Sequence, residues 1–260
     1  MYQQNVRGLQ IMEDIIYGKN AVTEALEAGT REINKIWIAN NIHTDNKIAK
    51  IKELAQKRGV IFQFVGKDKF APYNEVSHQG VIALISPIKY MEFEEFLSKP
   101  HKNSSLVVLD GVEDANNLGA IIRTCVCAGV EAIMIPSRRS VQVNSVVEKT
   151  SAGATNHISI IKVNSLVSAL QKLQESDWWV IAAEADAKDN YYDVDYTDMN
   201  FALVMGAEHA GVSKSIIKMA DFQVKIPMMK KFNSLNVSNA LSIIIFEAVR
   251  QNNIKNANVK

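Results

Sequence analysis

Polar side chains that could bind or activate a ligand gather in three separated segments in the second half of the chain. The segments span residues 117–123, 206–211 and 226–238. Their candidate side chains are Asn117, Arg123, Glu208, Ser234 and Asn236. An apolar, strand-like run precedes each segment, and a helical pattern follows it. Because loops beyond the carboxyl ends of strands bind ligands in open α/β sheets, the three segments predict an active site or a nucleotide-type binding site.

The first segment has a structural and a functional interpretation. Asn117 could simply cap a helix that starts at Leu118, and Arg123 could be a surface residue. However, the apolar stripe of this helix, which includes Ile121 and Cys125, lies beside Arg123 and not opposite it. We therefore favour a functional role for Arg123.

The other two segments are also open to a structural interpretation when each is taken alone. Gly206 and Gly211 would allow close backbone approach to a flat or anionic ligand, but a strand-to-helix turn explains them equally well. His209 is interpreted as a solvent-facing loop residue. Ser234 or Asn236 could cap the final helix, although a cap alone does not account for the long loop before it. Neither a dinucleotide fingerprint nor a P-loop sequence is present.

The composition predicts a soluble globular protein with one large or two ordinary domains. Of the 260 residues, 47% are apolar and 22% are charged. No apolar run is long enough to span a bilayer, and the N-terminus lacks the apolar core of a secretory signal. Cys125 and Cys127, the two cysteines, are interpreted as free thiols of a cytoplasmic protein. The sequence predicts no metal site.

Charge is distributed unevenly along the chain. The net charge is +1, but residues 1–90 hold 12 Lys and Arg against 9 Asp and Glu, and residues 91–260 hold 17 against 19. A basic first part could contact a polyanion such as RNA. A solvated helix face explains several of the lysines equally well, so charge alone does not identify a nucleic-acid-binding protein.

Hydrophobic periodicity predicts an α/β protein with a largely parallel sheet and helices on both faces. We expect a tail at residues 1–12, a small α/β domain at 13–86, a linker at 87–104 and a second domain at 105–260. Helices are expected at residues 20–28, 46–58, 118–128, 145–150, 165–174, 213–219 and 237–250. Strands are expected at residues 33–39, 60–65, 80–86, 106–109, 132–135, 158–162, 179–183, 201–205 and 223–226.

The three segments resemble the signature motifs of SpoU/TrmH-type RNA 2′-O-ribose methyltransferases, which belong to the SPOUT superfamily. The motifs read N-L-G-A-I-I-R, G-A-E-H-A-G and I-P-M followed by S-L-N-V-S, and they occur in the family's order. The sequences Y-G-K-N-A-V at residues 17–22 and H-Q-G-V at residues 78–81 look like the RNA substrate-binding domain of one branch. Members of that branch methylate a guanosine of 23S rRNA, the rRNA of the large ribosomal subunit.

The resemblance implies S-adenosyl-L-methionine as cofactor, a C-terminal trefoil knot and a homodimer in which both subunits contribute to the active site. It assigns cofactor-binding positions to Gly206, Ile226 and Leu235. It assigns the catalytic positions to Asn117, Arg123, Glu208, Ser234 and Asn236. An arginine has a pKa above ~12, so we interpret Arg123 as a contact to the phosphate of the target nucleotide rather than as a base.

One position departs clearly from the family pattern. Lys230 stands where the third motif usually has glycine. Glycine permits backbone conformations that lysine resists. Either the loop is reshaped around Lys230, or Lys230 adopts an extended conformation and directs its ammonium group toward RNA.

The resulting functional hypothesis is cofactor-dependent methylation of a ribose 2′-hydroxyl in RNA, with a guanosine of large-subunit rRNA as the target. Two alternatives stay open. One is a tRNA ribose 2′-O-methyltransferase, and the other is a non-catalytic RNA-binding or ribosome-assembly module. A nucleotide-dependent oxidoreductase is disfavoured because no dinucleotide fingerprint occurs.

Overall fold

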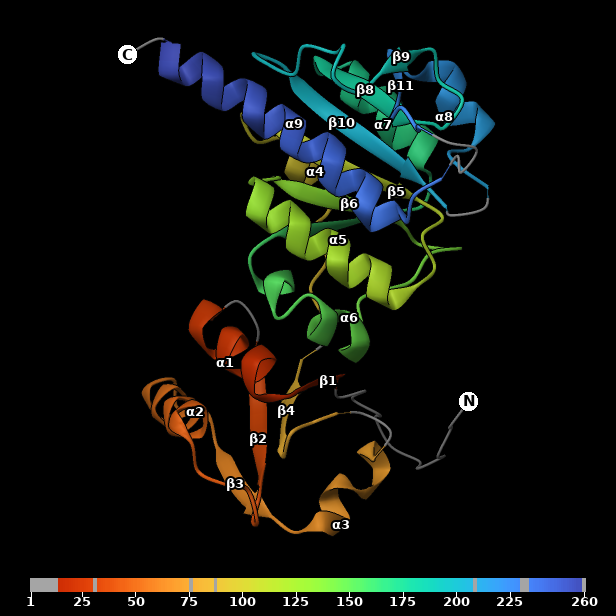
Figure 1. Cartoon of the computed structure of the whole chain (residues 1–260). Helices are drawn as coiled ribbons and strands as arrows, with labels where there is room; N and C mark the ends of the chain where they lie inside the picture. The colour runs from red at the N-terminus through yellow and green to blue at the C-terminus, as the bar shows by residue number, and fades with distance from the viewer. Residues whose placement is uncertain are drawn as a thin grey trace. The chain divides into compact units, whose positions relative to one another are not determined.

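The computed structural model describes residues 14–29, 32–74, 77–86, 88–207, 210–229 and 234–258. The predicted tail at residues 1–12 lies outside them. The chain divides into two compact units, Met1–Lys89 and Tyr90–Lys260, coloured red to orange and yellow to blue in Figure 1. None of the described helices is both long and apolar enough to cross a membrane.

Unit 1 is a four-stranded mixed sheet with the strand order β1-β4-β2-β3. Its elements are β1 (Asp14–Tyr17), α1 (Lys19–Ala28), β2 (Ile33–Ala39), α2 (Asn46–Lys57), β3 (Phe62–Val65), α3 (Lys67–Phe70) and β4 (Val81–Ile85). Alternation along β2 fills both faces, because Ile36 and Ile38 pack against α1 and α2 while Trp37 packs with Phe70 of α3.

Unit 2 contains a seven-stranded sheet with the order β7-β6-β5-β10-β8-β11-β9. All of its strand pairs are parallel. Its strands are β5 (Ser105–Asp110), β6 (Ala132–Pro136), β7 (Ser159–Val163), β8 (Trp178–Ala183), β9 (Asp189–Asn190), β10 (Asn200–Gly206) and β11 (Phe222–Lys225). Its helices are α4 (Phe93–Leu97), α5 (Ala115–Ala128), α6 (Ser145–Thr150), α7 (Leu166–Gln174), α8 (Lys214–Met219) and α9 (Val237–Asn258).

Helices cover both faces of this sheet, as the near-continuous apolar strands require. The side chains of α4, α7 and α8 pack in one core cluster with alternate residues of the strands. Helices α5 and α9 contact each other, and α9 also contacts β10; Figure 1 shows both helices in front of the sheet, with α7 behind it. The prediction of a largely parallel α/β sheet with helices on both faces is therefore confirmed for this unit.

The strand order reverses direction at the centre of the sheet. From β5 the chain moves outward to β6 and then β7, whereas β10 pairs with the other side of β5. Loops leaving the carboxyl ends of β5 and β10 therefore diverge. A reversal of this kind opens a crevice at the carboxyl edge of a parallel sheet, where ligands bind.

We expected a linker at residues 87–104, and its residues from Tyr90 onward fall in unit 2. Met91 forms a bridge with Ile161 beside β7. Phe93 and Phe96 of α4 are buried in the core of the sheet. Two polar residues of this helix, Glu94 and Glu95, are exposed, whereas its aromatic side chains pack inward.

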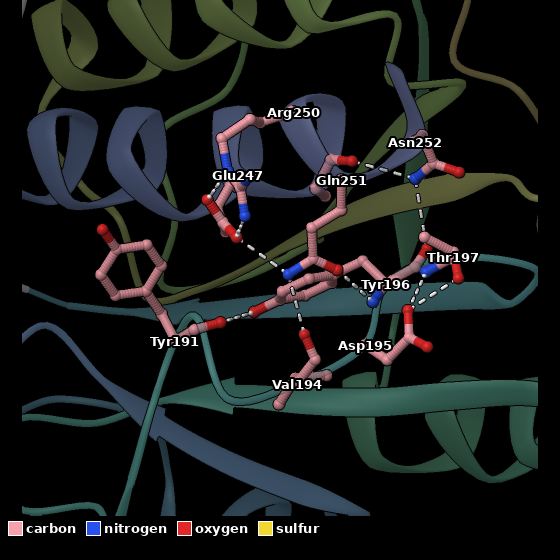
Figure 2. Close-up of polar contacts among 10 residues, drawn as sticks. Tyr191, Val194, Asp195, Tyr196, Thr197, Glu247, Arg250, Gln251 and Asn252 are labelled. Carbon is pink, nitrogen blue, oxygen red and sulfur yellow. Dashed lines mark hydrogen bonds and ion pairs between the residues drawn. The ribbon is translucent and has the colours of Figure 1, made fainter. Parts of the chain in front are cut away.

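The second half of α9 is fixed by polar contacts to the segment that precedes β10 (Figure 2). The Gln251 amide accepts a hydrogen bond from the Tyr196 N–H at 2.9 Å and donates one to the Val194 carbonyl at 3.1 Å. Asn252 donates to the Tyr196 carbonyl, and the buried Tyr196 hydroxyl donates to the Tyr191 carbonyl at 2.8 Å. These contacts hold α9 in register, so that its first turns lie at the crevice.

Candidate active site

A cavity of about 430 Å³ opens at the carboxyl ends of β8, β10 and β11. Gly206, Ile226 and Leu235, the three residues expected to bind the cofactor, all line it. Ser234 lines it as well, and the first turns of α9 form one wall. Its volume lies within the range of small-molecule sites, about 300–1,000 Å³. The structure thus brings four of the predicted site residues to one cavity.

Gly206 lies at a point where two stretches of backbone touch. A Cβ atom added to Gly206 would lie 2.0 Å from the Gly211 carbonyl carbon and 2.2 Å from the Val212 nitrogen. The loop doubles back here, because the Gly211 N–H donates to the Ala207 carbonyl at 2.9 Å. Gly211 itself has a φ of 65°, a conformation that favours glycine. Both glycines of the second motif are therefore required by the geometry of the cavity wall.

Glu184 is a site residue that the sequence analysis missed. It follows β8 directly, and its carboxylate lines the cavity. The carboxylate accepts a hydrogen bond from the Val212 N–H at 2.5 Å, and thereby ties the loop after β10 to the loop after β8. The signal was present, since Glu184 follows a predicted strand, but only the strand order shows that β8 lies next to β10.

Asn117 and Asn236 meet although they lie far apart in the sequence. The Asn236 amide donates to the Asn117 side-chain oxygen at 2.9 Å. The Asn236 oxygen accepts from the Ser238 N–H at 3.0 Å and from its hydroxyl at 2.6 Å. The cap of α5 is Asp114, whose carboxylate accepts from the Asn117 N–H at 2.8 Å. The N-cap of α5 is therefore Asp114 and not Asn117.

Asn117 lines a second cavity, which adjoins the first. The second cavity has a volume of about 350 Å³ and is lined by Asn117 and Asp114 together with the loop after β5. Ala207, Ala210 and Val237 line both cavities. A group bound beside Asn117 would therefore adjoin a molecule bound in the larger cavity, which is the arrangement that group transfer between two reactants requires.

Arg123 does not join this group within one chain. Its side chain is exposed, and it lines neither the cavity at Gly206 nor the cavity at Asn117. Gly119, one helical turn before it, faces Thr150 of α6, whereas Thr124 pairs with Ser242 of α9. Arg123 therefore follows the α6 side of α5.

Three further residues of the sequence analysis, Glu208, His209 and Lys230, lie outside the described residues. Among the residues that are described, no group of three or more His, Cys, Asp or Glu side chains could hold a metal ion.

Comparison with known families identifies both units. Residues 104–246 match the SpoU rRNA methylase family, and residues 15–91 match the RNA 2′-O ribose methyltransferase substrate-binding domain. A protein of Staphylococcus haemolyticus named as a TrmH family tRNA/rRNA methyltransferase is 41% identical over 92% of this chain and 97% of its own length.

Solved structures share the fold. The SpoU methyltransferase AviRb from Streptomyces viridochromogenes in complex with AdoMet matches with a TM-score of 0.77 and 20% identity, over 93% of this chain and 90% of that one. The TrmH/SpoU tRNA-modifying enzyme of A. aeolicus matches with a TM-score of 0.54 and 32% identity, over 63% of this chain and 82% of that one. Together with the family matches, these findings show that the chain belongs to the SpoU/TrmH family of RNA methyltransferases.

Proposed function

We propose that this protein transfers a methyl group from S-adenosylmethionine to the 2′-hydroxyl of a guanosine ribose in large-subunit rRNA, and that it acts in the cytoplasm. The observation that carries the proposal is the pairing of Asn117 with Asn236 beside the cavity lined by Gly206, Ile226 and Leu235. Two adjoining sites, one for a nucleoside-like cofactor and one for an acceptor, match a transfer reaction between two bound reactants.

The lining of the larger cavity fits the cofactor. Gly206 leaves backbone atoms uncovered where a side chain could not be placed, and Leu235 offers an apolar surface that is 41% exposed. The Glu184 carboxylate adds negative charge to the lining, which suits a cationic ligand. Gly206, Ile226 and Leu235 would hold the adenosine part. When bound, the cofactor supplies a methyl group activated by its sulfonium charge.

The asparagine pair would orient the acceptor ribose. The Asn236 oxygen is occupied by Ser238, which fixes the direction of the Asn236 amide N–H group toward Asn117. Ser234 lines the cofactor cavity. Together with Glu208, these residues would align the ribose hydroxyl for in-line attack. Arg123 would bind the phosphate of the target nucleotide with its guanidinium, through two parallel hydrogen bonds.

A homodimer is part of this proposal. Ile243, Phe246 and Ile254 are spaced along one side of α9 and are 37%, 45% and 49% exposed. An exposed apolar stripe on a long helix is typical of an interface. Because Arg123 lines neither the cavity at Gly206 nor the cavity at Asn117 in its own chain, a dimer would allow it to serve the site of the partner subunit.

A trefoil knot in the C-terminal part is also proposed. Gly206 touches the backbone at Gly211 and Val212, so the chain packs tightly on itself after β10, as a knot in this part requires. The loop between β11 and α9 lies at the same cavity, since Met228 and Ser234 both line it.

The substrate-binding unit favours rRNA over tRNA. The tRNA-modifying enzyme of A. aeolicus matches 63% of this chain, so a substantial part of the chain has no counterpart in that match. Residues 15–91 match a dedicated substrate-binding domain instead. A larger, folded RNA would make use of such an additional contact surface.

The proposal is tested by incubating the purified protein with S-adenosylmethionine labelled in its methyl group. Unmodified transcripts of large-subunit rRNA and of total tRNA serve as acceptors. We expect label in rRNA only, in a nucleotide whose 3′ linkage resists alkaline hydrolysis because its 2′-hydroxyl is blocked. Label in tRNA alone would replace the rRNA assignment. Cofactor binding without transfer to either RNA would favour the non-catalytic module.

A further inference from the structure

A third cavity of about 410 Å³ lies at the carboxyl edge of the same sheet, on the β6 side. Arg138 and Arg139, in the loop after β6, line it together with Ser165 and Ser213. None of the three family motifs includes these arginines. The arginine side of this cavity therefore lies outside the three motifs.

The loop that presents the two arginines is firmly built. The Ser137 N–H and hydroxyl both donate to the Val163 carbonyl, at 2.8 and 3.1 Å. The Ser140 hydroxyl donates to the Val112 carbonyl at 3.2 Å, and the Gln142 amide donates to the Pro136 carbonyl at 3.2 Å. The loop is thus anchored to the neighbouring β7 edge and to the loop after β5, so its tip is held in a fixed position.

Arg139 occupies the tip in an unfavourable backbone conformation. Its φ is 55°, in the left-handed region that favours glycine. Such conformations persist at binding sites when the surrounding hydrogen bonds enforce them. Both arginines are exposed, and within the described part of the chain neither guanidinium forms an ion pair or a hydrogen bond. Two unpaired cations on a rigid loop are suited to an anionic ligand.

This cavity adjoins the proposed reaction site. Ala207, Ala210 and Gly211 line both it and the cofactor cavity. Carboxylates also line it, but one of them, Asp110, already accepts a hydrogen bond from the Ser213 N–H at 2.7 Å. An anion bound by the arginines would therefore lie near an acceptor ribose bound beside Asn117.

We propose that Arg138 and Arg139 bind a phosphodiester group of the substrate RNA next to the nucleotide that is methylated. This assignment rests on the proposed function, because it requires RNA at the asparagine pair. A guanidinium binds phosphate oxygens through two parallel hydrogen bonds. Contacts of this kind fix the register of a nucleic acid without reading its sequence. The two arginines would thereby set which ribose meets the cofactor.

The test compares full-length variants by RNA binding and by cofactor binding. Arg138→Ala removes one guanidinium, and Arg139→Gly removes the other while relieving the left-handed backbone, so it should fold at least as well as the wild type. Lys102→Ala is the matched control, because the exposed Lys102 precedes β5 at the opposite edge of the sheet. Calorimetry measures the Kd for S-adenosylmethionine, and filter binding at several salt concentrations measures the Kd for unmodified large-subunit rRNA.

Each arginine variant should weaken RNA binding about tenfold and lower the slope of log K against log salt by about one. Cofactor affinity should stay at the wild-type value, and Lys102→Ala should change neither quantity. If both arginine variants bind RNA with the same affinity and the same salt slope as the wild-type protein, this assignment is overturned while the proposed function stays intact. A wild-type protein that binds the cofactor but no RNA would overturn the proposed function and the phosphate site together.

Discussion

Substitution of Gly206 by alanine tests the close backbone contact between Gly206 and Gly211 at the cofactor cavity. The added Cβ would lie 2.0 Å from the Gly211 carbonyl carbon and 2.3 Å from its oxygen. Both are main-chain atoms, so no side-chain rotation relieves the overlap. Overpacking of this severity costs about 3 kcal/mol or more. Each kcal/mol lowers the melting temperature of a chain of this size by roughly 2–4 °C.

Cofactor binding should suffer as well. To restore ordinary contact, the Gly211–Val212 backbone must move by more than about 1 Å. A misplacement of reacting groups by about 1 Å costs about 100-fold in activity. Calorimetry with S-adenosylmethionine and a thermal melt of the same sample measure the two effects. Because Glu184 holds this loop through the Val212 N–H, a moved loop also loses that hydrogen bond.

Two other glycines separate the steric effect from the backbone effect. Gly129 has a φ of 73° with no atom within 4 Å of an added Cβ, so Gly129→Ala should cost only the left-handed penalty of about 1–2 kcal/mol. Gly66 also has open space and lacks a positive φ, so Gly66→Ala should be close to neutral. A Gly206→Ala protein that melts and binds cofactor like the Gly66→Ala protein would refute the reasoning.

Three further predictions concern single side chains. Arg123→Ala should lower methyl transfer more than tenfold and leave the Kd for S-adenosylmethionine unchanged, since Arg123 does not line the cavity at Gly206. A smaller loss of activity would contradict its role at the phosphate. Burial raises the pKa of the Cys125 thiol, whereas Cys127 is exposed. Because only the thiolate reacts, iodoacetamide should add one group to the native protein, at Cys127. Two adducts in the mass spectrum of the native protein would be inconsistent with a buried Cys125 thiol. Hydrogen bonds from Arg250 lower the pKa of Glu247, whose side chain is 10% exposed. The Glu247 charge therefore stabilises the fold above the unfolded pKa of about 4.3, and this contribution is lost as the pH falls through the lower folded pKa. Glu247→Gln should reduce the free energy of unfolding at pH 7 and make no difference in strong acid, and a pH-independent difference would argue against the ion pair.

The spacing of the apolar residues predicts most of the helices and strands. The strand Ile33–Ala39 and the helix Ser145–Thr150 have the predicted bounds. Helix α5 begins at Ala115, three residues before the predicted start, because Asp114 caps it and not Asn117. Helix α9 continues to Asn258, beyond the predicted end at Arg250. Its extension is stabilised by side chains that bind another segment, and periodicity alone does not show such partners.

Short strands were missed for a related reason. The strand β1 has four residues and β9 has two, and each exists through pairing with a strand distant in sequence. An isolated stretch of this length has no recognisable period. Strand pairing is a property of the tertiary fold, so the sequence pattern of β1 and β9 could not predict it.

The residues of the candidate site were likewise predictable only in part. Gly206, Ile226 and Leu235 were expected to act together, and they line one cavity. Glu184 was missed because adjacency of β8 and β10 depends on strand order. Arg123 was grouped with Asn117 because both lie in one motif, but the turn of the helix directs them to different neighbours. Sequence spacing located the loops of the site, whereas the register of the helix decides which side chains meet in one chain.

The central claim is 2′-O-methylation of a guanosine in large-subunit rRNA, and a map of ribose methylation tests it most directly. Total RNA from cells that lack this protein is compared with RNA from the parent strain and from cells complemented with the wild-type or Gly206→Ala chain. We expect one guanosine of large-subunit rRNA to lose its methyl group, and only the wild-type chain to restore it. An unchanged rRNA map, or loss of a methyl group from tRNA alone, would contradict the account.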